Sequence, residues 1–197
     1  MESSLIDGLS ERISQASSIY SSVGVVLPSN NYTDFSHAMF EYMKTKKSIT
    51  WVYVTITNQF HGIKKQYPEI IDSLNIRFID CVSLAAGIKS NDNLCYFLDS
   101  PSQLEKLTLE IMSFIKESTR DENSVVVIDS LSSLILYNDD LLITEFFSHL
   151  VNNLNLVNAH SISLCIEEEM NDMMHNILYL KNEKILKIKE SFIYMKY

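Results

Sequence analysis

Glycine, proline and cysteine are all scarce in this chain of 197 residues, which contains 4, 3 and 3 of them respectively. No segment rich in glycine, proline or serine is present to act as a linker, so we expect a single domain spanning residues 1–197. The cysteines, Cys81, Cys95 and Cys165, are far apart and form no CxxC pair. This spacing argues against a disulfide framework and favours reduced thiols in the core.

Positive charge is also in short supply, because 16 lysines and arginines face 25 acidic residues and leave a formal net charge of −9. That charge repels a phosphate backbone, and no Lys/Arg stripe offsets it locally, so we expect no nucleic-acid partner. The first residues show no basic segment followed by an apolar core, and no apolar run is long enough to cross a bilayer. We therefore expect a cytoplasmic protein with no membrane partner.

What the chain does contain is enough apolar sequence for a normal core, at 46% hydrophobic residues. The most informative stretch is SVVVIDS at 124–130. A strand this uniformly apolar is expected to be buried on both faces, which is typical of a central strand in a parallel sheet covered by helices. Asp129 then stands at the carboxyl end of that strand, where open α/β sheets bind their ligands.

Strand and helix patterns alternate along the rest of the chain. Further strands are predicted at 23–27, 49–56, 76–82, 94–98 and 161–166. Helices are predicted after Thr33, around Phe60, from Pro68 to Leu74, at 101–117 and at 140–157. For the helix at 101–117 we expect Ser100 as the N-cap, Pro101 at the first helical position and Gln103 in a capping box.

The two ends of the chain show different patterns. Residues 1–20 are expected to form a short amphipathic helix, whose apolar stripe is Leu5, Ile6, Leu9, Ile13 and Ala16. The acidic segment 167–176 is expected to be a short helix or loop. Residues 177–197 are expected to form a hairpin that turns at 181–183 and a last edge strand, with lysines alternating outward as edge protection.

This order of elements resembles the RecA-type P-loop NTPases, and most of all the KaiC-like branch found widely in archaea. The most specific match is VVVIDSLSSLILYND followed by the long helix, which is similar to the Walker B strand of that branch and the segment after it. The resemblance covers residues 18–189 or so. It implies a three-layer α/β/α RecA-like domain with a mainly parallel sheet, which here ends in a C-terminal β-hairpin.

In that family the loop after the first strand is GxxxxGK[ST], whose amides and lysine hold the phosphates. The matching stretch here, LPSNNYTDF, has no glycine and no lysine, and Asp34 adds negative charge. Thr33 alone could replace the magnesium-binding hydroxyl. An ordinary polar turn in which Thr33 caps the next helix explains the same residues and is the interpretation we favour.

A second departure concerns the glutamates with which the family ends its second strand and activates water. Here the sequence is VYVTITNQF, and neither Thr57 nor Asn58 can act as a general base near neutral pH. We therefore assign no catalytic residue. Asp129 matches the Walker B acid that would hold Mg²⁺, and Ser130 follows it. The interpretation we favour is that Asp129 caps the next turn or is left over from an active ancestor.

Other candidate sites are weaker. The five histidines, His37, His61, His149, His160 and His175, show no ligand spacing with one another or with cysteine. Ser130, Ser132 and Ser133 lie in no GxSxG motif, which argues against a hydrolase. The acids Glu167, Glu168, Glu169 and Asp172 could bind a cation or a basic partner, although such a run is more often a solvated helix start.

The leading hypothesis is a non-catalytic regulatory or scaffold module with a KaiC/RecA-like fold and no cofactor. Its partner would be a protein, such as a KaiC/RecA-like ATPase or a second copy of this chain. The alternative is a nucleotide-binding protein or slow ATPase that holds ATP and Mg²⁺ with Thr33, Asp129 and Ser130. A recombination-type DNA binder is a third class, which the missing basic surface disfavours.

Overall fold

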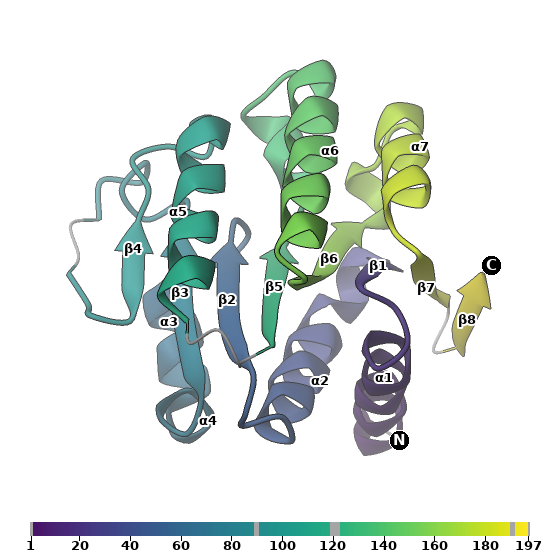
Figure 1. Cartoon of the computed structure of the whole chain (residues 1–197). Coiled ribbons are helices and arrows are strands. Elements are labelled where there is room, and N and C mark those ends of the chain that lie inside the picture. The colour runs from purple at the N-terminus through teal and green to yellow at the C-terminus, as the bar shows by residue number, and fades with distance from the viewer. Residues whose placement is uncertain (1, 89–90, 119–122, 190–191, 197) are drawn as a thin grey trace.

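The computed structural model describes residues 2–88, 91–118, 123–189 and 192–196, and the side chains of residues 6–88, 91–118 and 123–188. These residues form one sheet in the order β4-β3-β2-β5-β6-β1-β7-β8 (Figure 1). All neighbouring strands from β4 to β7 are parallel, and β8 runs antiparallel to β7. The strands are β1 Ser22–Leu27, β2 Thr50–Thr55, β3 Asn75–Asp80, β4 Cys95–Phe97, β5 Ser124–Asp129, β6 His160–Ile166, β7 Lys184–Lys189 and β8 Phe192–Lys196.

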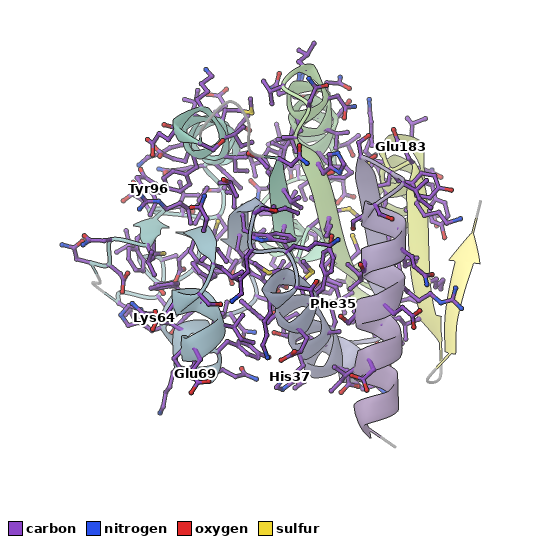
Figure 2. All side chains as sticks on the ribbon, turned by 60° about the horizontal axis from the view of Figure 1, so that its bottom comes forward. Phe35, His37, Lys64, Glu69, Tyr96 and Glu183 are labelled. Carbon is purple, nitrogen blue, oxygen red and sulfur yellow. The ribbon has the colours of Figure 1, made fainter. Side chains whose placement is uncertain are left out.

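Helices cover both faces of the sheet, which confirms the predicted three-layer α/β/α architecture (Figure 2). One core cluster packs under α1 Glu2–Ser17, α2 Tyr32–Lys44, α3 Phe60–Gln66 and α4 Pro68–Asp72. The other packs under α5 Leu104–Glu117, α6 Asp140–Leu156 and α7 Asp172–Lys181. None of the helices in the described part of the chain has both the length and the apolar character needed to cross a bilayer.

Strand β5 holds the central position that its composition predicts. It lies between β2 and β6, and every residue from Ser124 to Asp129 is buried. Val125 and Val127 belong to the core cluster on one face, whereas Val126 and Ile128 belong to the cluster on the other. Burial on both faces is the reason why the strand is apolar without alternation.

Helix α1 confirms the predicted amphipathic helix at the N-terminus. Leu9, Ile13 and Ala16 are buried, and Ile6 packs against the same core cluster. The side chain of Leu5, which the pattern also assigned to this stripe, lies outside the described residues.

Two predicted helix starts are wrong. Helix α2 begins at Tyr32 with Asn31 at the cap position, so Thr33 lies inside its first turn and is not the cap. Helix α5 begins at Leu104, three residues later than Pro101. The hydroxyl of Ser100 instead accepts a hydrogen bond from the amide of Ser102, and the segment 101–102 forms a turn.

The predicted C-terminal hairpin exists but lies further along the chain. Residues 177–181 belong to α7, and the antiparallel pair is β7 with β8. Strand β7 is therefore not an edge, because it lies between β1 and β8. Of its lysines, Lys184 is buried with Nζ 5.6 Å from the ring centre of Tyr20, and Lys187 forms a 2.5 Å ion pair with Glu167. Tertiary contacts thus engage both, and the prediction of outward, edge-protecting lysines is wrong for Lys184 and Lys187. The predicted last edge strand is β8, and the side chains of Lys189 and Lys196 lie outside the described residues.

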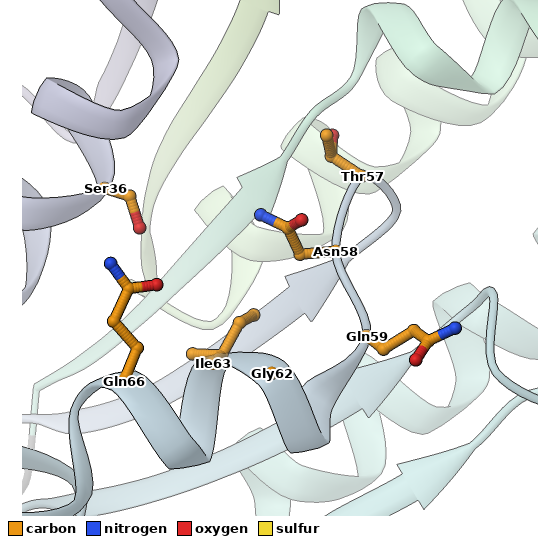
Figure 3. Close-up of a pocket in the computed structure, with 7 residues that line it drawn as sticks. All are labelled: Ser36, Thr57, Asn58, Gln59, Gly62, Ile63 and Gln66. Carbon is orange, nitrogen blue, oxygen red and sulfur yellow. The ribbon is translucent and has the colours of Figure 1, made fainter.

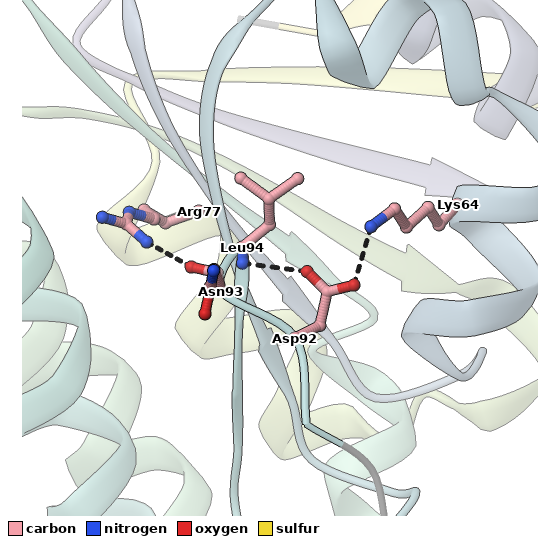
Figure 4. Close-up of polar contacts among 5 residues, drawn as sticks. All are labelled: Lys64, Arg77, Asp92, Asn93 and Leu94. Carbon is pink, nitrogen blue, oxygen red and sulfur yellow. Dashed lines mark hydrogen bonds and ion pairs between the residues drawn. The ribbon is translucent and has the colours of Figure 1, made fainter.

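The opposite edge is fixed by a polar turn before β4 (Figure 4). Asp92 accepts a 2.6 Å bond from Lys64 Nζ and a 3.0 Å bond from the amide of Leu94. Arg77 donates to the carbonyl of Asn93. These contacts tie the end of the predicted loop to α3 and β3, so the short strand β4 can pair with β3.

Candidate functional site at the carboxyl edge of the sheet

Two buried carboxylates stand at the carboxyl edge of the sheet, at the ends of β3 and β5 with β2 between them. Asp80 is fully engaged by local structure. It accepts hydrogen bonds from the amides of Phe60, Val82 and Ser83 and from the hydroxyl of Ser83, over 2.6–2.9 Å. A carboxylate with this many donors organises the loops around it, and we assign Asp80 a structural role.

Asp129 has a different environment, built from tyrosine hydroxyls. Tyr53 on β2 donates to Asp129 Oδ2 over 2.6 Å, and Tyr32 on α2 donates to the same oxygen over 2.7 Å. Asn58, just after β2, donates to the Tyr32 hydroxyl over 2.9 Å. Oδ1 of Asp129 is buried and has no hydrogen-bond partner among the described residues. The carboxyl group is therefore held on one side and unsatisfied on the other.

This burial sets the protonation of the cluster. Desolvation raises the pKa of Asp129 to about 6, although the bonds from Tyr53 and Tyr32 oppose the shift. Burial and the nearby Asp129 charge together raise the pKa of both tyrosines far above its usual range. The hydroxyls therefore remain protonated donors at every working pH, and the group that titrates is the carboxyl of Asp129.

The predicted site residues are only partly brought together. Thr33 is exposed, and its hydroxyl forms no hydrogen bond with any described residue. It is the preceding residue, Tyr32, that reaches Asp129. Ser130 is fully buried and follows Asp129, but its hydroxyl faces a different cluster.

That second cluster joins the turn after β5 to the acidic run after β6. Ser130 Oγ lies 2.7 Å from Ser133 Oγ, and the hydroxyls of Ser132 and Ser133 donate to Glu169 Oε2 over 2.7 and 2.9 Å. Ser132 Oγ also accepts from the amide of Ile166 over 2.9 Å. Ser130 and its neighbours thus fasten the turn after β5 to the end of β6 and to Glu169.

The loop after β1 is contacted by another acid of the same run. Glu168 accepts hydrogen bonds from the amide of Ser29 over 2.9 and 3.1 Å and from the Ser29 hydroxyl over 3.1 Å. Desolvation opposes ionisation of Glu168, but its own backbone amide and these bonds from Ser29 outweigh it and lower its pKa. A carboxylate of the chain itself therefore lies against the first amide of the loop that corresponds to the phosphate loop of the resembled family.

A polar pocket of about 380 Å³ opens between α2 and α3, next to the end of β2 (Figure 3). Its walls carry amides and hydroxyls and no charged side chain: Ser36, Thr57, Asn58, Gln59, Gly62, Ile63 and Gln66. Asn58 connects this pocket to the Tyr32–Asp129 pair behind it. The residues that end β2 therefore line a cavity, although they offer no general base.

Side chains of metal-ligating types, thiols among them, occur in the described residues. No group of three or more His, Cys, Asp or Glu side chains in the described part of the chain is arranged to hold a metal ion. Cys81, Cys95 and Cys165 are free thiols; Cys81 and Cys165 lie in the core as expected, whereas Cys95 is half-buried. Burial raises the pKa of Cys81 and Cys165, which keeps both thiols in the unreactive neutral form.

Comparison with known proteins identifies which proteins share this fold. No protein-family model and no curated protein matches the sequence. Solved structures do match. A KaiC-like protein from the archaeon Pyrococcus horikoshii gives a TM-score of 0.57 at 13% identity, over 89% of this chain and 75% of its own. The fold is that of the RecA/KaiC-like proteins.

Two further solved structures match at similarly low identity. An uncharacterised P. horikoshii protein, solved in complex with an unknown peptide, gives a TM-score of 0.65 at 10% identity over 89% of this chain and 81% of its own. The flagellar accessory protein FlaH from Methanocaldococcus jannaschii gives 0.53 at 14% identity over 88% and 74%. At identities this low, the similarity concerns the fold alone.

The sequence did not reveal the partners of Asp129 or of the acidic run. Tyr32 and Tyr53 are separated from Asp129 by 97 and 76 residues. Glu168 and Glu169 were candidates for a cation or a basic partner, but they bind Ser29 and the serine cluster. The available signal was that 167–169 follow a buried strand, so they must lie at the same edge as Asp129.

Proposed function

We propose that this protein is a non-catalytic module with a KaiC/RecA-like fold, which acts as a regulator or scaffold through protein–protein interaction. The observation that carries the proposal is the contact between Tyr32 and Asp129. In the resembled family an acid at this position holds Mg²⁺ beside the phosphates, whereas here the first residue of α2 bonds to the carboxyl group directly. The chain's own side chain takes the place of the ligand.

The loop after β1 supports the same proposal. A phosphate needs amides that are free to donate and a cation to balance its charge. The segment 28–35 contains no glycine and no lysine, and the amide of Ser29 already donates to Glu168. The carboxylates of Glu168 and Asp34 would repel a triphosphate. These residues therefore fit a magnesium–nucleotide poorly, and we derive no chemical step from one.

Asp129 adds a third argument. A metal ligand must be ionised, and burial raises the pKa of this carboxyl to about 6, so it is mostly ionised at pH 7 but loses its charged form as pH falls through 6. The acid also has no free approach from solvent, since it is fully buried under Tyr32 and Tyr53. We propose that the Asp129–tyrosine cluster stabilises the fold.

The alternative is a nucleotide-binding protein or slow ATPase with a non-standard phosphate loop. One observation favours it, which is the unsatisfied Oδ1 of Asp129 at the same edge as the 380 Å³ pocket. A rotation of Tyr32 would remove one of the two donors to Asp129, and Thr33, the next residue of α2, would then supply the hydroxyl for Mg²⁺. In this case Tyr32 would act as a gate.

Calorimetric titration with ATP and Mg²⁺ separates the two. For the non-catalytic module we expect no heat of binding at millimolar nucleotide for the wild type, Asp129→Ala or Thr33→Ala. Micromolar binding that is lost in both variants would overturn the proposal and establish the alternative. Thr108→Ala, which removes a hydroxyl bonded only to the Leu104 carbonyl, is the matched control for Thr33→Ala.

A further inference from the structure

The outer surface of the α5–α6–α7 layer carries a groove that shares no lining residue with the carboxyl-edge pocket described above. It lies between α5 and α6, which run over the same face of the sheet (Figure 1), and has a volume of about 560 Å³. Helix α5 contributes Leu104, Glu105 and Leu109 to its walls, and α6 contributes Leu142, Glu145 and Phe146.

The groove is apolar at its centre although it is open to solvent. Leu109 is 69% exposed and Leu142 is 50% exposed, one on each helix, whereas Phe146 is 6% exposed and forms the floor. Large apolar side chains gathered around an open groove are typical of a surface that a partner covers. The exposed leucines are not needed by the core, because Leu107 and Ile111 of α5 and Ile143 and Leu150 of α6 already supply the buried face.

The rim of the groove is acidic. Glu105 on α5 and Glu145 on α6 line it, and neither forms an ion pair or hydrogen bond with a described residue. Lys106, the adjacent cation, is engaged by Asp99 over 2.8 Å. With a net charge of −9 for the chain, this rim attracts basic segments and repels acidic ones.

The groove is long enough along α6 to take a short helix. Its lining residues on α6 recur at helical spacing along one stripe, at 142, 145, 146, 149 and 153. A stripe of this span is about 16 Å long, or about three helical turns. An amphipathic helix that lays leucine-type side chains between Leu109 and Leu142 would bury them, and flanking lysines or arginines would meet Glu105 and Glu145.

We propose that the α5–α6 groove binds an amphipathic, basic helix of a partner protein. This inference rests on the proposed function, since it names the partner class of an interaction module. A second copy of the chain fits less well, because it carries the same negative charge. Its own amphipathic N-terminal helix, ESSLIDGLSERISQAS, has three acids and one arginine, and Leu9, Ile13 and Ala16 of its apolar stripe are buried.

Fluorescence anisotropy tests the proposal with a labelled helical peptide of about 14 residues, made of leucine at helical spacing and lysine elsewhere. The comparison peptide carries glutamate in place of every lysine. We expect the lysine peptide to bind and the glutamate peptide not to bind. Leu109→Asp and Leu142→Asp should each weaken binding at least about tenfold. Leu156→Asp is the matched control, since Leu156 is 81% exposed on α6 and does not line the groove.

Charge reversal makes the test sharper, because a lysine peptide can bind any acidic surface. The double variant Glu105→Lys/Glu145→Lys should lose the lysine peptide and gain the glutamate peptide. The inference would be overturned if the affinity for the lysine peptide is unchanged in these variants, or if it falls by the same factor in Leu156→Asp. So would a dimer in sedimentation that Leu109→Asp dissociates, since the occupant would then be a second copy. If the protein binds ATP and the peptide response is intact, only the proposed non-catalytic function is refuted. If the protein binds neither ATP nor the lysine peptide, only the groove proposal is refuted.

Discussion

The hydroxyl of Tyr32 donates a 2.7 Å hydrogen bond to Oδ2 of Asp129, 97 residues further along the chain. The bond ties the first turn of α2 to the end of β5, the two elements between which the resembled family binds its nucleotide. Tyr53 donates to the same oxygen from β2. Three elements of the sheet edge therefore meet at one carboxyl group, and the stability of this cluster can be measured.

Removing the Tyr53 hydroxyl should destabilise the protein. Tyr53→Phe keeps the buried ring and deletes a donor to a carboxylate, so we expect a loss of about 1.5–3 kcal/mol in the free energy of unfolding above pH 7. The loss should shrink at pH 4, where the carboxyl is neutral. Denaturant unfolding measures it, and Tyr137→Phe is the control, because that exposed hydroxyl bonds to no described residue. Equal effects of the two variants would contradict the assigned bond.

Replacing Asp129 by asparagine should change the pH dependence of stability. Burial raises the pKa of this carboxyl to about 6 in the folded state from an ordinary value of 3.8. The folded protein therefore binds more protons than the unfolded chain between these values, and stability falls as pH rises through this window. A shift of this size corresponds to about 3 kcal/mol.

An asparagine side chain cannot ionise, so the variant Asp129→Asn should not show this loss. We expect its unfolding free energy relative to wild type to improve by up to about 3 kcal/mol between pH 4 and pH 7. Chemical denaturation at a series of pH values gives the difference curve. A flat curve would mean that Asp129 titrates with an ordinary pKa, and Asp72→Asn on the exposed side of α4 supplies the baseline.

Two glycines should respond to alanine in opposite directions. A Cβ on Gly24 of β1 would lie 2.5 Å from Ile185 Cδ1 and 3.2 Å from Asn182 Nδ2. Gly24→Ala should therefore cost about 1–3 kcal/mol, and Ile185→Val in the same chain should recover part of it. Gly62, inside α3, has no atom within 4 Å of such a Cβ, so Gly62→Ala should stabilise by up to about 1 kcal/mol. Thermal unfolding of Gly24→Ala, Gly24→Ala/Ile185→Val and Gly62→Ala measures the three changes in stability.

Glu168 should contribute a small, pH-dependent amount of stability. Its own amide and its bonds to Ser29 lower its pKa against partial desolvation, so the contribution is present above the ordinary glutamate pKa and is lost as pH falls through the folded value. Since the side chain is exposed, we expect Glu168→Ala to cost less than about 1 kcal/mol at pH 7 and nothing near pH 3. Glu117→Ala, at an exposed position on α5, is the comparison. A cost that is the same at both pH values would contradict the role of the carboxylate.

The fold could be predicted from the sequence where local pattern and tertiary environment agree. The run SVVVIDS predicts a strand buried on both faces, and β5 lies at the centre of the sheet with its side chains in both core clusters. The predicted helix starts at Thr33 and Pro101 are wrong because capping residues are weak local signals, which neighbouring contacts override. The predicted strand at residues 177–181 is wrong because a short apolar run, ILYLK, fits a strand as well as a buried helix.

The sequence by itself determined the fold class, the placement of Asp129 at the carboxyl edge, and the lack of glycine and lysine in the loop after β1. These follow from side-chain period and local composition, which the chain carries in each segment. Only the tertiary structure decided that Tyr32 and Tyr53 hold Asp129, that Glu168 engages Ser29, and that α5 and α6 leave an apolar groove with an acidic rim. Such contacts join residues far apart in the chain, and their geometry is set by strand order and helix packing, which no local pattern specifies.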